Sequence, residues 1–284
     1  KAFEVSFSYY DEEIRFLLIE VSDNLLLLLD NHRRQIWSLI QKTLLTEFKQ
    51  ELGCSFLTSE DLKKILLNCK KNVSKELFYK RFVAKGVFGK RIDFTDVYYE
   101  KLRGSNYLEA FEKAKNKKGW VQMIEIYDSS NISDFIISRK GEIILRQGDL
   151  YFLLNNILRF QVEVIEEKYK FYNNRDRITT KNKPKPILIT FKDAVFDSKE
   201  KISKFFDKLG TYQNSNISVV EKGNPFLYIN ILDRRDMSSF SVRTYNEDAL
   251  LILPKIKTSS IALQRFSRYL MENFMEGVID EYNK

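Results

Sequence analysis

The sequence predicts an α+β protein, with a helical N-terminal portion followed by a mixed α/β C-terminal portion. Two observations favour this class: apolar residues recur at helical spacing between about residues 11 and 53, and short strand-like apolar runs dominate after Gly119. Of the 284 residues, 44% are hydrophobic and 14% aromatic, so the chain can form one large core or two ordinary ones. The expected parts are a mainly helical basic domain at 1–118, a mixed α+β segment at 119–172, a linker or exposed loop at 173–186, and an α/β domain at 187–284.

The N-terminal region is expected to begin with a strand and to continue with helices. Residues 2–10 alternate apolar and polar side chains, as a half-buried strand does. Asp11 can cap a helix with an acidic first turn, and a second apolar stripe extends from Ile36 to Leu52. The run Leu25–Leu29 is apolar on every side of a helix, so it requires a cover and can serve as a dimerisation surface.

Residues 58–103 carry the ingredients of a winged-helix module. Thr58 or Ser59 can cap one helix and Ser74 a second, with Gly86 after the last turn of the second. The segment 86–92, GVFGKRI, can then form a wing-like hairpin. A basic second helix of this kind can lie in a groove of nucleic acid. An ordinary helical subdomain is the alternative interpretation.

The rest of the chain alternates short strands and helices. Gly119 follows a basic segment at 109–118 and marks the expected boundary, and Pro184 and Pro186 oppose helix in the linker. Strands are predicted at 121–127, 134–138, 142–146, 161–168, 187–191, 226–232, 240–245 and 249–253. Helices are predicted at 150–158, 198–209 and 259–282, the last of them long and amphipathic.

Positive charge is concentrated in two stretches. The chain has 47 Lys and Arg against 39 Asp and Glu, a formal net charge of +8. Residues 60–120 hold 16 basic and 8 acidic side chains, and residues 166–209 hold 12 basic and 7 acidic ones. The net positive charge of these two stretches together is therefore larger than that of the whole chain. Clustered Lys and Arg bind phosphates by releasing condensed counterions. The charge therefore favours a nucleic-acid-binding protein or non-catalytic subunit that holds the phosphate backbone of DNA or RNA, and not an enzyme. A solvated surface in a Lys-rich chain is the alternative.

The two basic stretches supply the expected phosphate contacts. Those of the first stretch are Lys63, Lys64, Lys70, Lys71, Lys75, Lys80, Arg81, Lys85, Lys90 and Arg91. Those of the second, a flexible clamp, are Arg175, Arg177, Lys181, Lys183 and Lys185. Aromatic residues such as Phe78 and Tyr79 interleave with the first stretch, and bases stack on such rings.

Two other functions fit the same sequence. The first is a protein-interaction subunit of a larger complex, such as an antiviral defence or mobile-element complex, which would use a protein partner or a second copy. The second is a Mg²⁺-dependent nuclease in which Asp149 and Glu166 hold the metal and Lys168 steadies the attacking water. This set resembles the core of the restriction-endonuclease-like family. A further acidic pair, Asp233 and Asp236, fits a charged turn in which the two carboxylates form ion pairs with the two arginines that lie between them in the sequence.

Several classes of protein are excluded by what the sequence lacks. Cys54 and Cys69 are too few for a disulfide framework, and with one His they do not complete a zinc site, so a reducing, cytoplasmic location is expected. No Gly-rich phosphate loop is present, and His32 stands outside any nucleophile pattern. The apolar stretch 16–29 is shorter than the roughly 20 residues that cross a bilayer. Neither a membrane partner nor a cofactor other than the Mg²⁺ of a nuclease is expected.

Overall fold

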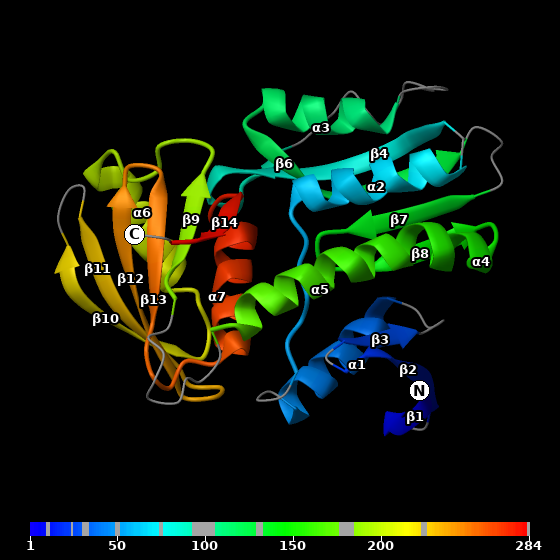
Figure 1. The fold of residues 1–284 in the computed structure, drawn as a ribbon, viewed down its shortest axis with the longest axis horizontal. Coiled ribbons are helices and arrows are strands. Elements are labelled where there is room, and N and C mark those ends of the chain that lie inside the picture. Colours follow the sequence, from blue (N-terminus) through cyan, green and yellow to red (C-terminus); the bar gives the residue numbers. More distant parts are fainter. Residues whose placement is uncertain are drawn as a thin grey trace. The chain divides into compact units, whose positions relative to one another are not determined.

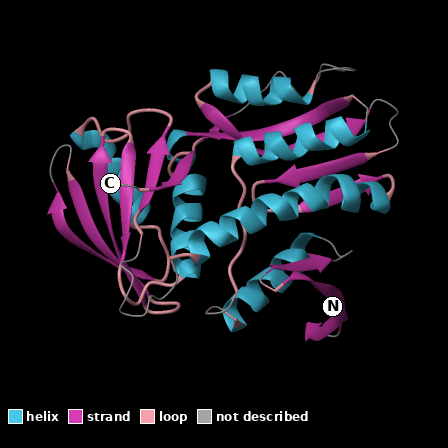
Figure 2. Cartoon of the chain, viewed as in Figure 1, coloured by secondary structure: helices cyan, strands magenta, loops and turns pink. Residues whose placement is uncertain are grey.

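The computed structural model describes residues 1–9, 12–23, 25–29, 34–48, 52–73, 76–92, 106–128, 133–175, 185–222 and 226–282. These residues form three antiparallel sheets and the helices that cover them (Figures 1 and 2), which confirms the predicted α+β class. The chain divides into two compact units, Lys1–Gly53 and Cys54–Lys284, and each is described by itself.

The N-terminal unit begins with a three-stranded sheet, so the helix expected after Asp11 is wrong. The strand expected at 2–10 is confirmed, and the helical stripe from Ile36 is confirmed as far as Glu47. Its elements are β1 (Ala2–Tyr9), β2 (Glu12–Ser22), β3 (Leu25–Leu29) and α1 (Arg34–Glu47). Ile14 and Phe16 point to one face of β2 and are buried with Ile40 of α1, whereas Leu17, which follows Phe16 and points to the other face, is exposed. A run rich in Leu and Ile fits the period of a helix and that of a strand equally well, and here the pairing between strands determines which of them forms. Leu29 of the predicted interaction surface is exposed, and its partner stays a prediction.

The second unit begins with a five-stranded sheet in the order β5-β4-β6-β7-β8. Its strands are β4 (Leu77–Gly86), β5 (Arg91–Ile92), β6 (Gly119–Asp128), β7 (Asp134–Ser138) and β8 (Ile143–Gln147). Its helices are α2 (Ser59–Val73), α3 (Tyr107–Asn116), α4 (Leu150–Leu153) and α5 (Arg159–Asn173), with a 3₁₀ turn η1 at Val87–Gly89 and a π-helical turn at Leu154–Leu158.

Two predicted elements of this part are wrong. The second helix of the winged-helix pattern is the strand β4, whose pairing with β6 buries Leu77, Tyr79 and Phe82 and overrides their helical spacing. The predicted strand at 161–168 is the middle of α5, because Gln161 and Ile165 lie one turn apart and are both buried. The predicted α2, β6, β7, β8 and the helix after Asp149 are confirmed.

The remainder of the second unit is a six-stranded sheet in the order β10-β11-β12-β13-β9-β14. Its strands are β9 (Ile187–Phe191), β10 (Ser215–Lys222), β11 (Leu227–Asp233), β12 (Ser238–Asn246), β13 (Ala249–Pro254) and β14 (Gly277–Glu281). Two helices accompany it, α6 (Lys199–Leu209) and α7 (Ser260–Asn273), each capped by a serine hydroxyl. Strands β10 and β14 were not predicted. The predicted C-terminal helix stops at Asn273, and the chain returns as β14 beside β9.

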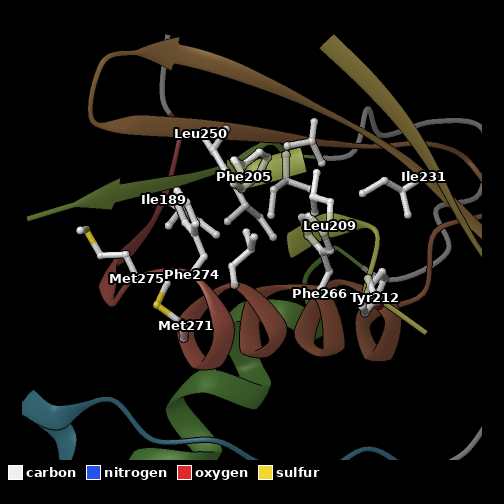
Figure 3. Close-up of a cluster of buried hydrophobic side chains, with 14 of the residues drawn as sticks. Ile189, Phe205, Leu209, Tyr212, Ile231, Leu250, Phe266, Met271, Phe274 and Met275 are labelled. Carbon is white, nitrogen blue, oxygen red and sulfur yellow. The ribbon is translucent and has the colours of Figure 1, made fainter. Parts of the chain in front are cut away.

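The largest core of the second unit lies between the six-stranded sheet and its two helices. Phe274, which follows α7, is fully buried and lies among Ile189, Phe205 and Met271 in Figure 3. Trp120 of β6 belongs to the same buried cluster, so the core is continuous with the five-stranded sheet. Strand β10 lies at one edge of the six-stranded sheet and carries a β-bulge between Val219 and Glu221.

Candidate nucleic-acid interface

One face of the five-stranded sheet carries three helices. The ion pair Lys63–Glu112 (3.8 Å) joins α2 to α3, and the ion pair between Lys168 and Asp61 joins α5 to α2, so the three helices form one layer. Lys113 of α3 donates a hydrogen bond to the Tyr79 hydroxyl at 3.0 Å. The layer therefore covers the face that carries Tyr79, Ile126, Phe135 and Leu145, which lie opposite one another on β4, β6, β7 and β8.

The opposite face is not covered by any helix among the residues that the structure describes. Because side chains alternate between the faces of a strand, this face carries a row of Arg81, Glu125, Ile136 and Ile144, each opposite the next. We call it the open sheet face. Ile144, on the edge strand β8, is exposed.

Ion pairs fix three cations on the open sheet face. The Nε atoms of Arg81 and Arg146 contact opposite oxygens of Glu125, the second at 3.4 Å, and Lys80 is paired with Asp134. The three cationic side chains are 47%, 41% and 47% exposed for Lys80, Arg81 and Arg146, whereas the two carboxylates are only 8% and 12% exposed. The acids thus lie low in the sheet and hold the cations above them, toward the outside of the sheet.

A pair of aromatic rings adjoins these cations. Phe78 and Tyr127 are directly opposite each other, with ring centroids 5.5 Å apart and an interplanar angle of 33°. The Nζ atom of Lys80 lies 5.7 Å from the centroid of the Tyr127 ring. Both rings are half-buried, so part of each remains accessible. Rings of this kind stack on nucleic-acid bases, while nearby Arg and Lys bind phosphates or stack on bases themselves.

The predicted phosphate contacts separate into several groups in the structure. Lys80 and Arg81 lie on the open sheet face, whereas Lys64 and Lys71 are exposed on α2. Carboxylates neutralise three others, in the pairs Lys63–Glu112, Lys70–Glu76 and Lys185–Glu281. Three lie around η1, namely Lys85, Lys90 and Arg91. Four fall outside the described residues, namely Lys75, Arg177, Lys181 and Lys183.

Arg175 was predicted as a phosphate contact, and the structure places it where no phosphate can reach. It is only 1% exposed. Its guanidinium donates to the carbonyl of Phe171, lies 3.9 Å from the centre of that residue's ring and forms an ion pair with Glu281 at 3.1 Å. A buried guanidinium with these partners fastens the end of α5 to β14.

The residues of the predicted nuclease site do not adopt the geometry that the prediction required. Asp149 caps α4 by accepting a hydrogen bond from the Tyr151 amide at 2.8 Å. Glu166 and Lys168 lie on α5 and not at the end of a strand, and Lys168 is bonded to Asp61 and to the Phe56 carbonyl. Within the described ranges, no three carboxylate, histidine or cysteine side chains converge to hold a metal ion.

Lys168 belongs instead to a buried charged network that ties four segments together. Arg139, in the turn between β7 and β8, donates to the Leu57 carbonyl at 2.9 Å and to the Met271 carbonyl at 3.3 Å. Glu276 accepts a hydrogen bond from the Ser59 amide. Burial raises the pKa of Glu276, although the charge of Arg139 opposes the shift. These groups join α2, α5, the β7–β8 turn and the end of α7, which is a structural role.

The second acidic pair is also structural, although its partner differs from the predicted one. Asp233 and Asp236 both form ion pairs with Arg265 of α7, at 3.1 and 3.0 Å. The predicted ion pairs were instead with the two arginines that lie between them in the sequence. Asp236 also accepts a hydrogen bond from the hydroxyl of Ser259, the cap of α7. Burial raises the pKa of Asp236, but the Ser259 bond and the charge of Arg265 outweigh burial and hold it below its usual value.

A pH-dependent loss of stability follows for Asp236→Asn. Because its pKa is depressed in the folded state, the carboxylate stabilises the fold above the usual aspartate pKa of about 3.9, and this contribution is lost as the pH falls below that value. We expect the variant to be about 1–3 kcal/mol less stable than the parent at pH 7 and the difference to shrink toward pH 3. Urea unfolding across this range measures it, with the exposed Asp193→Asn as control. A difference that does not change with pH would contradict the assignment.

The two cysteines form no disulfide. Burial, and then the charge of Asp128, raise the pKa of the Cys69 thiol to about 12, so it stays protonated and unreactive. Cys54 is partly buried. No helix in the part of the chain that the structure describes has the length and apolar character to cross a membrane.

Sequence reasoning found Lys80, Arg81 and Phe78 but missed Arg146 and Tyr127. The available signal was the alternation on two strands, since Tyr127 and Arg146 stand two residues after Glu125 and Ile144 and so share their face. Comparison with models of protein families, with curated proteins and with solved structures finds no match to this chain.

Proposed function

We propose that the unit Cys54–Lys284 binds single-stranded nucleic acid on the open sheet face. The observation that carries the proposal is the ring pair Phe78–Tyr127 beside three exposed cations on a sheet face without a helix. Four-stranded sheets in RNA-binding modules use the same chemistry, with rings that stack two or three bases. We infer the class of ligand from this chemistry and not from similarity to a known protein.

Single strands fit this face better than a duplex does. A duplex is commonly read by a helix in its major groove, and the helix predicted for that role is the strand β4. A sheet face with stacking rings instead requires unpaired bases, because the bases of a duplex are already stacked on each other. We therefore expect binding with little sequence preference and with a strong dependence on salt.

The cation test compares Arg81→Gln/Arg146→Gln with Lys115→Gln/Lys257→Gln, which makes the same charge change at exposed lysines elsewhere. With a labelled single strand, we expect the arginine variant to bind at least about tenfold more weakly. The slope of log affinity against log salt should become shallower by about 1.4, because two phosphate contacts are lost. An equal loss in both variants, or tighter binding of a duplex than of a single strand, would overturn the proposal.

The stacking test uses Tyr127→Leu, with the exposed Tyr151→Leu as control. Loss of one base–ring stack is expected to weaken binding by about 1–3 kcal/mol, which is roughly 5- to 150-fold. The salt slope should not change, since no charge is removed. An unaltered affinity in Tyr127→Leu would show that the ring does not contact a base.

A further inference from the structure

Lysines from several elements gather around the last turn of α7. Lys85 of β4 donates a hydrogen bond to the Glu272 carbonyl at 3.4 Å. Lys208 of α6 lies beside the same turn, because its carbonyl accepts a hydrogen bond from the Tyr269 hydroxyl. The two lysines therefore approach the end of α7 from a strand and from a helix.

Two further lysines complete the group. The Nζ atom of Lys204, one turn before Lys208 on α6, lies 6.0 Å from the centre of the Phe88 ring in η1. Lys140 follows Arg139, whose guanidinium donates to the Met271 carbonyl in the same turn of α7. We call Lys85, Lys140, Lys204 and Lys208 the α7 lysine cluster.

The backbone of η1 is fitted closely to the end of α7, which fixes the geometry of the cluster. The Phe88 amide donates to the Phe274 carbonyl at 2.6 Å. Gly89 has a φ of +69°, and a Cβ atom there would lie 3.2 Å from the Asn273 carbonyl oxygen, so the turn requires glycine. The strand end that carries Lys85 is thus held in place beside α6.

The charges of the cluster repel one another. Lys204 and Lys208 are four residues apart on one helix, where like charges destabilise the helix. Burial lowers the pKa of Lys85, and the charges of Arg139, Lys140 and Lys208 lower it further, while Glu272 opposes the shift. A bound anion would relieve this repulsion.

The carboxylates of the described residues do not neutralise the cluster. Lys140, Lys204 and Lys208 form no ion pair within this part of the chain, and Glu272 is engaged by Arg268 at 2.8 Å. Cations often stand at a helix C-terminus, where they complement the helix dipole. Lys85 meets that need through the Glu272 carbonyl and Arg139 meets it through the Met271 carbonyl, so the other three lysines are available to a ligand.

We propose that the α7 lysine cluster binds a phosphate-bearing anion of the size of a pyrophosphate group. Phosphate is compact and multiply charged, and lysine ammonium groups bind it as mobile point charges from several directions. Such a group can belong to the 5′ end of a nucleic-acid strand or to a free nucleoside triphosphate. The proposal does not depend on the open sheet face, whose residues are different.

Calorimetric titration of the full chain with sodium pyrophosphate tests the site. The test variant is Lys140→Ala/Lys204→Ala/Lys208→Ala, and the control is Lys71→Ala/Lys115→Ala/Lys257→Ala, which removes equal charge from exposed positions elsewhere. We expect saturable binding by the parent and the control, and at least tenfold weaker binding by the test variant. Absence of saturable binding by the parent, or equal affinity in the two variants, would overturn the proposal. Circular dichroism confirms that both variants are folded.

Competition identifies the source of the phosphate group. A strand with a 5′-triphosphate that displaces pyrophosphate, when the same strand with a 5′-hydroxyl does not, would support a nucleic-acid end. Displacement by ATP but not by the 5′-triphosphate strand would support a free nucleotide. Failure of both competitors would overturn the phosphate assignment. The variant Arg81→Gln/Arg146→Gln should bind pyrophosphate as the parent does, so failure of this site and failure of the open sheet face are distinguishable.

Discussion

Replacing Arg139 with methionine is expected to lower the free energy of unfolding by about 3–5 kcal/mol. The arginine side chain is almost completely buried and donates to the carbonyls of Leu57 and Met271. Removing it leaves these carbonyls and the buried carboxylate of Glu276 without their cation. Urea unfolding followed by circular dichroism measures the loss.

The neighbouring Lys140→Met is the control, because Lys140 is exposed and should change stability by no more than about 0.5 kcal/mol. The double variant Arg139→Met/Glu276→Gln should be more stable than the sum of its single changes predicts, since the second change removes the charge that the first leaves unpaired. A stability of Arg139→Met within about 1 kcal/mol of the parent would show that the network does not hold the segments together.

Phe274→Ala is expected to lower the free energy of unfolding by a similar amount, about 3–5 kcal/mol. The Phe274 ring lies 5.1 Å from Phe88, 5.2 Å from Phe191 and 4.7 Å from Phe205, measured between ring centroids. Its removal leaves a cavity bounded by β9, α6 and η1, which rigid aromatic neighbours cannot fill.

The matched control for this change is Phe226→Ala, at an exposed phenylalanine beside β11. Phe274→Leu should retain part of the stability, because leucine fills part of the cavity. In a Trp37→Phe background, fluorescence reports Trp120, which is buried in the same cluster. Its transition should fall at the same urea concentration as the transition followed by circular dichroism. A loss in Phe226→Ala equal to that in Phe274→Ala would contradict the central position of Phe274.

Strong local patterns allowed much of the second unit to be predicted. Ser59, Ser198 and Ser259 lie at helix starts, and the serine side chains at 198 and 259 accept hydrogen bonds from the first turn. β4 was missed because Leu77, Phe78 and Phe82 fit a helix as well as a strand, and the choice depends on pairing with β6, more than thirty residues away. β14 was missed because its burial depends on β9, which lies far away in the sequence.

The candidate site could be predicted only in part, because charge does not reveal pairing. Lys80 and Arg81 were found among the basic residues, but nothing local shows that Glu125 would hold Arg81 and Arg146 together. Arg175 has the same local composition as an exposed clamp residue, and only the position of β14 buries it. Long-range contacts therefore decide which of many cations can face a ligand.

The β-bulge of β10 also has a consequence for how the protein behaves at high concentration. Strand β10 lies at an open sheet edge, where unpaired backbone groups invite a second copy to add a strand and begin an aggregate. Val219 and Val220 are exposed there and would favour such pairing. The extra residue Val220 bends and twists the strand, and Glu221 follows with a charge. The bulge thus lets two exposed valines remain on an open edge without offering a straight template to another molecule.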